Sequence, residues 1–186
     1  MTSERMARRR EERRAAILAA AREIAEQDGW AAVTSRRLAD AIEYTQPVIY
    51  SHFPSMDAVI DAVAVEAFDE FARVLKRART RASDARGALE ALIRAYLRYA
   101  KMHQAIYDAM FVRSTSLVFA HADTSPQLVA GFTELRLAVE PYSSAPDTMA
   151  ELLWANLHGL TLLQNAGRIR KDGGQRVTAL VQLIAG

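Results

Sequence analysis

Two short helical segments joined by a very brief connection, between residues 34 and 53, constrain this chain more than any other feature. Thr34 is a good N-cap for a first helix, whose apolar residues, among them Leu38, fall on one face. Thr45 offers a second N-cap, and Pro47 falls in the first turn of a second helix, where a missing N–H costs little. Because the connection allows only a compact, angled pair, we predict a helix-turn-helix.

The second predicted helix has Val48 and Ile49 on its inner side, which leaves other side chains free to face outward. These are Gln46, Pro47, Tyr50 and His52. The amide of Gln46 and the ring side chains of the other three residues suit contacts with base edges and phosphates in a DNA groove. We therefore predict that this helix enters the major groove of DNA.

Several motifs in this region together resemble the DNA-binding domain of the tetracycline repressor (TetR) family. The family pattern has a Thr-Ser or Thr-Thr start and a Leu-Tyr-x-His-Phe close. This chain has Thr34-Ser35, Arg36, Gln46-Pro47, Ile49-Tyr50-Ser51-His52-Phe53 and then Pro54-Ser55. The resemblance covers roughly Arg14 to Val59 and is specific, since several motifs agree at once. It implies an all-α protein with a helix-turn-helix domain at residues 1–57 and a larger helical domain for ligand binding and dimerisation at 58–186.

The resemblance also implies roles for single residues of the motif. Arg36 matches a position that can fork onto guanine O6 and N7, although a phosphate contact or a plain surface arginine fits the sequence too. Gln46 can pair with adenine, and Pro47 can rest against a thymine methyl group. The remaining matches imply phosphate contacts. The predicted DNA-binding residues are Thr34, Ser35, Arg36, Thr45, Gln46, Pro47, Tyr50 and His52.

Two positions depart from the family pattern. Glu43 stands in the turn where the family usually has glycine, and a left-handed backbone there would cost a non-glycine residue roughly 1–2 kcal/mol. Met56 stands where the family usually has lysine after Ser55, so one common phosphate anchor is missing. Either change could lower the affinity for DNA or shift it toward other contacts.

Positive charge is concentrated at the start of the chain. Residues 1–22 hold seven arginines against three glutamates, whereas residues 23–57 hold two arginines against six acidic residues. Arg8, Arg9 and Arg10 fit either a solvated tail or an arm that contacts phosphates or the minor groove. The DNA-binding half is therefore neutral in total, with its positive charge in this arm.

The helical periodicity of the rest of the chain predicts six further helices, two of them long. We predict them at residues 13–27, 56–79, 88–112, 126–141 and, as two helices split by 168–174, within 147–186. Gly29 would cap the first of these. Trp30 and Val33 would join its core. The helix at 56–79 is long enough to belong to both domains, and the resemblance implies that it transmits a motion between them.

The predicted helix at 88–112 has a stripe of side chains that are both apolar and capable of hydrogen bonding. It fits a bundle core, or the wall of a cavity with a few placed polar groups. The pattern Trp154-x-x-x-His158-Gly159 also resembles one subgroup of the family's C-terminal domains. The predicted ligand-binding residues are Tyr96, Tyr99, His103, Tyr107, Met110, Trp154 and His158, and the predicted effector is an apolar or aromatic small molecule.

The last two predicted helices are apolar enough to need a partner surface. A glycine inside a helix costs roughly 1 kcal/mol against alanine, so Gly159 indicates close approach of another helix. The resemblance implies a four-helix bundle across a two-fold axis, and hence a homodimer. The predicted dimerisation residues are Leu152, Ala155, Gly159, Leu162, Leu180 and Ile184.

Other classes of protein fit the sequence less well. The chain has no cysteine, its four histidines lack metal-ligand spacing, and it has neither a nucleophile elbow nor a Gly-rich phosphate loop, so we expect no enzyme, metal or cofactor. Charges interrupt every apolar stretch, so we expect a cytoplasmic protein without a membrane span. We predict a ligand-released, operator-binding repressor. The main alternative is a non-enzymatic small-molecule-binding protein of the same fold that has lost specific DNA binding.

Overall fold

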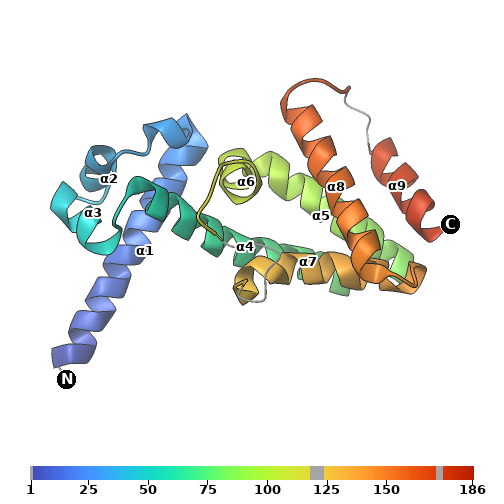
Figure 1. The fold of residues 1–186 in the computed structure, drawn as a ribbon, viewed down its shortest axis with the longest axis horizontal. Coiled ribbons are helices and arrows are strands. Elements are labelled where there is room, and N and C mark those ends of the chain that lie inside the picture. The colour runs from blue at the N-terminus through green and yellow to red at the C-terminus, as the bar shows by residue number, and fades with distance from the viewer. Residues whose placement is uncertain (1, 118–123, 171–173) are drawn as a thin grey trace. The chain divides into compact units, whose positions relative to one another are not determined.

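The structure is a computed structural model that describes residues 2–117, 124–170 and 174–186. These residues form nine α-helices and two short 3-10 helices with no β-strand among them, which confirms the predicted all-α class (Figure 1). The elements are α1 (Thr2–Asp28), η1 (Trp30–Ala32), α2 (Ser35–Ala41), α3 (Gln46–His52), α4 (Met56–Thr80), α5 (Ala85–Met102), α6 (Gln104–Phe111), α7 (Pro126–Val139), η2 (Glu140–Tyr142), α8 (Pro146–Asn165) and α9 (Gln175–Ala185).

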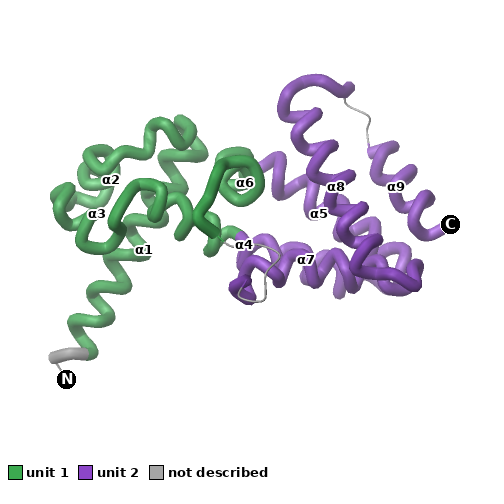
Figure 2. Tube along the Cα trace, in the orientation of Figure 1, with its two compact units in different colours: residues 1–67, 103–117 green, residues 68–102, 118–186 purple. Residues whose placement is uncertain are grey.

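The chain divides into two compact units, which Figure 2 distinguishes by colour. Unit 1 consists of residues 1–67 and 103–117, and unit 2 consists of residues 68–102 and 118–186. The chain therefore leaves unit 1 inside the unbroken helix α4 and returns to it for α6. The functional division after residue 57 stays a prediction.

The core of unit 1 forms where α1, α2, α3, α6 and the first half of α4 bury their apolar faces. Its fully buried side chains include Ile17, Leu18, Leu38, Ile49, Val59 and Ile106. Gly29 ends α1 with φ 81° and donates its N–H to the carbonyl of Ala25 at 2.8 Å, as predicted for a C-cap. Trp30, 7% exposed, donates its indole N–H to the carbonyl of Ala105 at 2.6 Å. This bond fixes α6 within unit 1.

Helix α1 starts well before the predicted residue 13. Its first half is exposed and consists mostly of charged side chains at helical spacing, such as Arg8 and Glu12, whose Nε and Oε1 lie 3.6 Å apart. Arginine and glutamate have high helix propensity, and such i,i+4 pairs add a few tenths of a kcal/mol each. The arginine-rich arm is therefore a continuation of α1.

The single helix predicted at residues 88–112 is wrong, because the structure breaks it at His103. That residue has φ −124° and ψ 58°, so α5 ends at Met102 and α6 begins at Gln104. No proline or glycine marks the break. Contacts within unit 1 hold it instead, since the imidazole Nδ1 of His103 lies 3.2 Å from Oε1 of Glu26 on α1.

In unit 2, α5 packs against α7, α8 and α9, and α7 packs against α8. Aromatic rings fill the space beside α4, since Phe71 lies 5.2 Å from Tyr96 and 5.1 Å from Tyr99 between ring centroids. A largely buried ion pair, Arg79 Nε to Glu134 Oε2 at 2.8 Å, joins α4 to α7.

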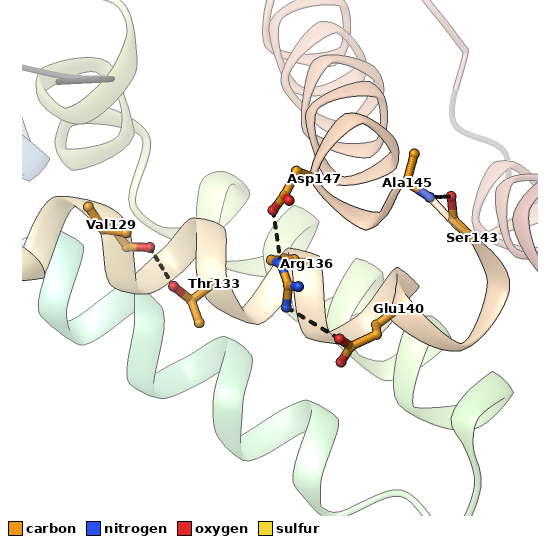
Figure 3. A network of polar contacts seen from close by, with 7 residues as sticks. All are labelled: Val129, Thr133, Arg136, Glu140, Ser143, Ala145 and Asp147. Atoms are coloured by element: carbon orange, nitrogen blue, oxygen red, sulfur yellow. Dashed lines mark hydrogen bonds and ion pairs between the residues drawn. The ribbon is translucent and has the colours of Figure 1, made fainter. Parts of the chain in front are cut away.

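A polar network holds the corner between α7 and α8 (Figure 3). Arg136 on α7 donates to Oδ1 of Asp147 in the first turn of α8 at 2.9 Å, and it contacts Glu140 one turn farther on at 3.4 Å. In the connection itself, Ala145 donates its N–H to Oγ of Ser143 at 3.1 Å. Hydrogen bonds between the two helices and within the connection therefore hold this corner.

Candidate nucleic-acid interface

Local capping builds the helix-turn-helix from α2 and α3. Thr34 is extended and accepts the N–H of Arg37 on its side-chain oxygen at 3.2 Å, so it caps α2 as predicted. Thr45 occupies the N-cap position of α3, without a side-chain hydrogen bond, and Pro47 lies in the first turn. Ile49 is fully buried on the inner side of α3.

Glu43 has a left-handed backbone in the turn between the two helices, with φ 57°. It is the one non-glycine residue with positive φ among the described residues. The following residue, Tyr44, donates its N–H to the carbonyl of Ala39 at 2.9 Å, which closes the end of α2. The turn therefore keeps the geometry that favours glycine and accepts the strain of a side chain there.

The predicted DNA-binding residues all lie on α2, α3 and their caps, and most are exposed. The exposed ones are Thr34, Arg36, Thr45, Gln46, Pro47 and Tyr50, and the half-buried ones are Ser35 and His52. Ser35 donates its hydroxyl to Oε1 of Gln46 at 2.9 Å, which links α2 to α3. Arg36 has no ion-pair partner among the described residues, so its guanidinium is available to an anion.

Arginines of α1 lie beside this motif, a feature that the sequence analysis missed. The guanidinium of Arg13 lies 5.5 Å from the ring centroid of Tyr44, and that of Arg14 lies 5.3 Å from the ring centroid of Phe53. Their side chains stack on aromatic rings at the turn and at the end of α3. The i,i+4 positions of Arg10 and Arg14 on one helix could have given a signal, but nothing in the sequence showed which face of α1 meets the motif.

The same arginines act electrostatically on α3. Burial lowers the pKa of His52 from its usual value of 6.5, and the positive charges of Arg10, Arg13 and Arg14 lower it further. His52 is therefore neutral near pH 7, and the surface beside it is positive. Such a surface attracts an anion, such as the phosphate backbone of DNA.

The residues predicted to bind a ligand do not all belong to one unit. Tyr96 and Tyr99, both buried on α5, are in unit 2, as are the half-buried Trp154 and His158 on α8. By contrast, His103, Tyr107 and Met110 belong to unit 1, where the last two are buried in its core. The break at His103 causes this separation, since the prediction had placed all five residues of 88–112 on one stripe.

Within unit 2, the two α8 residues have identifiable surroundings. Trp154 lies 6.4 Å from Phe132 on α7 between ring centroids, edge to face. Burial lowers the pKa of His158 below its usual 6.5. The imidazole of His158 is therefore neutral near pH 7.

The predicted dimerisation residues lie on α8 and α9 and differ in exposure. Leu152 and Leu162 are 54% and 40% exposed, and Ala155 is also exposed. Gly159 and Ile184 are half-buried, whereas Leu180 is 8% exposed and packs inside its own unit. Two residues that the prediction omitted, Leu163 and Leu183, are 42% and 79% exposed.

Gly159 has no close neighbour from another helix among the residues that the structure describes. A Cβ placed on it would meet no described atom within 4 Å. Close approach of a helix of the same subunit therefore does not explain this glycine.

Neither a metal-binding group nor a membrane-spanning helix is present in the part of the chain that the structure describes. It contains no group of three or more His, Cys, Asp or Glu side chains arranged to hold a metal ion. None of its helices has the length and apolarity needed to cross a bilayer.

Comparisons with known proteins identify both parts of the chain. Residues 17–63 match the family model "Bacterial regulatory proteins, tetR family", and residues 89–185 match "Tetracyclin repressor-like, C-terminal domain". The comparison with curated proteins gave no match.

Several solved structures share the fold. A protein of unknown function from Rhodococcus sp. RHA1 is 25% identical, with a TM-score of 0.73 over 92% of each chain. A TetR-family transcriptional regulator from Pectobacterium atrosepticum is 21% identical, with a TM-score of 0.69 over 95% of this chain and 92% of that one. RolR in complex with resorcinol is 16% identical, with a TM-score of 0.66 over 96% of this chain and 90% of that one.

The C-terminal model alone covers more than half of the chain, and the N-terminal model covers the helix-turn-helix whose capping and exposed face are described above. The chain therefore belongs to the TetR family of helix-turn-helix transcriptional regulators.

Proposed function

We propose that this protein is a ligand-responsive repressor that binds a palindromic operator as a homodimer and is released by a small molecule. The observation that carries the proposal is the outer face of α3. Gln46, Pro47 and Tyr50 are exposed there over the buried Ile49. A short helix with a fixed inner side and exposed hydrogen-bonding groups is what the major groove accepts.

Charge around α3 supports the same proposal. The unpaired guanidinium of Arg36 on α2 would read a guanine or hold a phosphate, and the arginines of α1 that lower the pKa of His52 would lie near the backbone. Phosphate contacts of this kind give most of the affinity, whereas contacts to base edges give the specificity. Both kinds of group are present in unit 1.

The homodimer is supported by the apolar side chains that α8 and α9 leave exposed. Leu152, Leu162, Leu163 and Leu183 are each at least 40% exposed in the single chain. With Ala155 and Gly159 they supply a surface that a second copy would cover. Two-fold symmetry then places the two recognition helices in half-sites about one helical turn, ~34–36 Å, apart. Because its target is DNA, we place the protein in the cytoplasm.

Effector control would use α4, which runs without a break from Met56 in unit 1 to Thr80 in unit 2. We propose that an apolar or aromatic effector binds among the aromatic side chains of unit 2, which include Tyr96, Tyr99, Trp154 and His158. It would weaken DNA binding only if it prefers the conformation whose recognition helices no longer match the operator.

Selection of random duplexes by the purified protein at moderate salt tests the proposal. We expect enrichment of a palindrome, and a loss of about tenfold or more in affinity for it in the Arg36→Ala variant, in line with the ~1–3 kcal/mol of one bidentate base contact. An equal loss of affinity for all duplexes would instead mean that Arg36 contacts a phosphate and not a base.

The rival function is a small-molecule-binding protein of the same fold that no longer reads DNA. The strained turn at Glu43 and the missing lysine at Met56 favour it. Under this alternative the selection would enrich no sequence, and all retention would disappear as the salt concentration rises.

A further inference from the structure

A basic groove lies between one face of α4 and α5 in unit 2. Its volume is about 520 Å³, which is within the range of sites for small molecules. Its lining residues are Glu70, Arg73, Val74, Arg77, Ala78, Arg81, Ala95 and Arg98. None of them belongs to the residues predicted to bind DNA, an effector or a second subunit.

The lining of this groove contains four arginines and one acidic residue, Glu70. Arg73 is partly neutralised, because its Nη2 lies 3.2 Å from Oδ2 of Asp69. Arg77, Arg81 and Arg98 are exposed and have no ion-pair partner among the described residues. Like charges gathered in one groove repel each other, and a bound anion would remove that repulsion.

Two other arginines of the same two helices are paired. Arg79 on α4 binds Glu134, and Arg94 on α5 binds Glu90 at 2.7 Å. Three of the four arginines that line the groove, Arg77, Arg81 and Arg98, thus have no such carboxylate partner among the described residues. Guanidinium groups bind phosphate and carboxylate through two parallel hydrogen bonds, whereas they gain little from isolated chloride ions.

Part of the lining of the groove is apolar, since it includes the half-buried residues Val74, Ala78 and Ala95. A ligand that fits has a compact body for these residues and at least two negative groups for the guanidinium groups.

We propose that this groove binds a small polyanion with two or more phosphate or carboxylate groups. The site is separate from the proposed operator contacts and from the proposed effector site. It does not rest on the proposed function, and its test needs no DNA.

Calorimetric titration of the full-length protein with inorganic pyrophosphate, and separately with citrate, tests this site. We expect saturable binding of at least one of them that weakens as KCl is raised, and the stronger of the two identifies the preferred anionic group. The Arg77→Gln/Arg98→Gln variant should bind roughly a hundredfold more weakly or worse, because it loses two charge-assisted hydrogen bonds, each of which contributes about tenfold or more in affinity.

Two matched variants serve as controls. Arg86→Gln/Arg168→Gln removes two exposed arginines of unit 2 outside the groove, and Arg8→Gln/Arg9→Gln/Arg10→Gln removes three from the arm. Both should bind as the parent does. Arg77→Lys/Arg98→Lys, which keeps the charge without the planar fork, should fall in between. Circular dichroism checks that each variant is folded.

Equal affinity in the parent and in Arg77→Gln/Arg98→Gln would overturn the proposal. The proposal would also be overturned if pyrophosphate and citrate gave no more heat than KCl of equal ionic strength. In that case the groove would be a candidate site for an acidic macromolecule and not for a small anion. A loss confined to the arm variant would place the anion on α1 instead and would equally overturn it.

Discussion

Ser35 holds Gln46 across the helix-turn-helix, since its hydroxyl donates to the side-chain carbonyl of Gln46 at 2.9 Å. The two residues are the first of α2 and the first of α3. An amide oxygen accepts two hydrogen bonds, so Gln46 keeps one acceptor position and its NH2 group for a base. The contact therefore orients the side chain that we propose to read adenine.

Replacing Ser35 by alanine should relax the choice of base at the Gln46 position. We expect discrimination there to fall by roughly three- to tenfold, as the loss of one hydrogen bond of about 1 kcal/mol implies. Binding to the selected palindrome and to duplexes changed at each position measures it. The control is Ser51→Ala, which removes a hydroxyl of α3 that donates to the carbonyl of Val48. An equal loss on every duplex would instead assign Ser35 to phosphate binding alone.

Replacing Glu43 by glycine should stabilise the protein. Its φ of 57° strains a side chain, and removing the Cβ relieves roughly 1–2 kcal/mol, from which the greater freedom of glycine in the unfolded chain subtracts. We expect a net gain of about 0.5–1 kcal/mol in the free energy of unfolding by urea. Glu43→Ala keeps the Cβ and should gain nothing. A similar gain in both variants would point to the charge of Glu43 and not to its backbone.

A substitution at Gly159 tests whether a second copy of the chain packs against α8 in the proposed dimer. A Cβ added there meets no other helix or side chain within 4 Å among the described residues, so we expect Gly159→Leu to keep the fold and to gain helix propensity. If a second copy packs there, the variant should dissociate at concentrations where the parent is dimeric, as sedimentation velocity would show. Gln164→Leu, an exposed position of the same helix that does not share the face of Gly159, controls for the added apolar surface. A Gly159→Leu protein that dimerises like the parent would place the interface elsewhere.

His158 should make stability depend on pH. Its folded-state pKa lies below 6.5, so as pH falls through about 6.5 the unfolded chain takes up the proton first. Stability is therefore lost as pH falls from 6.5 toward the folded pKa, and it is complete above 6.5. We expect His158→Gln to lose less stability than the parent between pH 7.5 and 5.5, measured by urea unfolding. His52 has a pKa lowered in the same direction and is present in both proteins, so it cancels.

The sequence predicted the helix-turn-helix closely because its signals are local. Thr34, Thr45 and Pro47 mark helix starts through their own side chains, and Gly29 marks a helix end through its own backbone. Each of these effects acts within one turn of the chain. The role of such residues can therefore be predicted without knowledge of the tertiary fold.

The break at His103 could not be predicted in this way. The sequence around it continues the helical pattern, and the contacts that hold the break come from Glu26 and Trp30, which are more than 70 residues away. For the same reason, the residues predicted to bind a ligand are divided between the two units, and the site itself stays a prediction. Similarly, the stacking of Arg13 on Tyr44 depends on which face of α1 meets the motif.

The return of the chain to unit 1 has a consequence for exchanging parts between relatives. A chimera that takes only residues 1–67 from one regulator would leave the indole of Trp30 facing a foreign α6, although Ala105 supplies its acceptor through a backbone carbonyl. Likewise, one parent would supply residue 103 and the other would supply residue 26, although His103 and Glu26 contact each other in this protein. The transplantable module is therefore two separate gene segments, 1–67 and 103–117, which must be exchanged together.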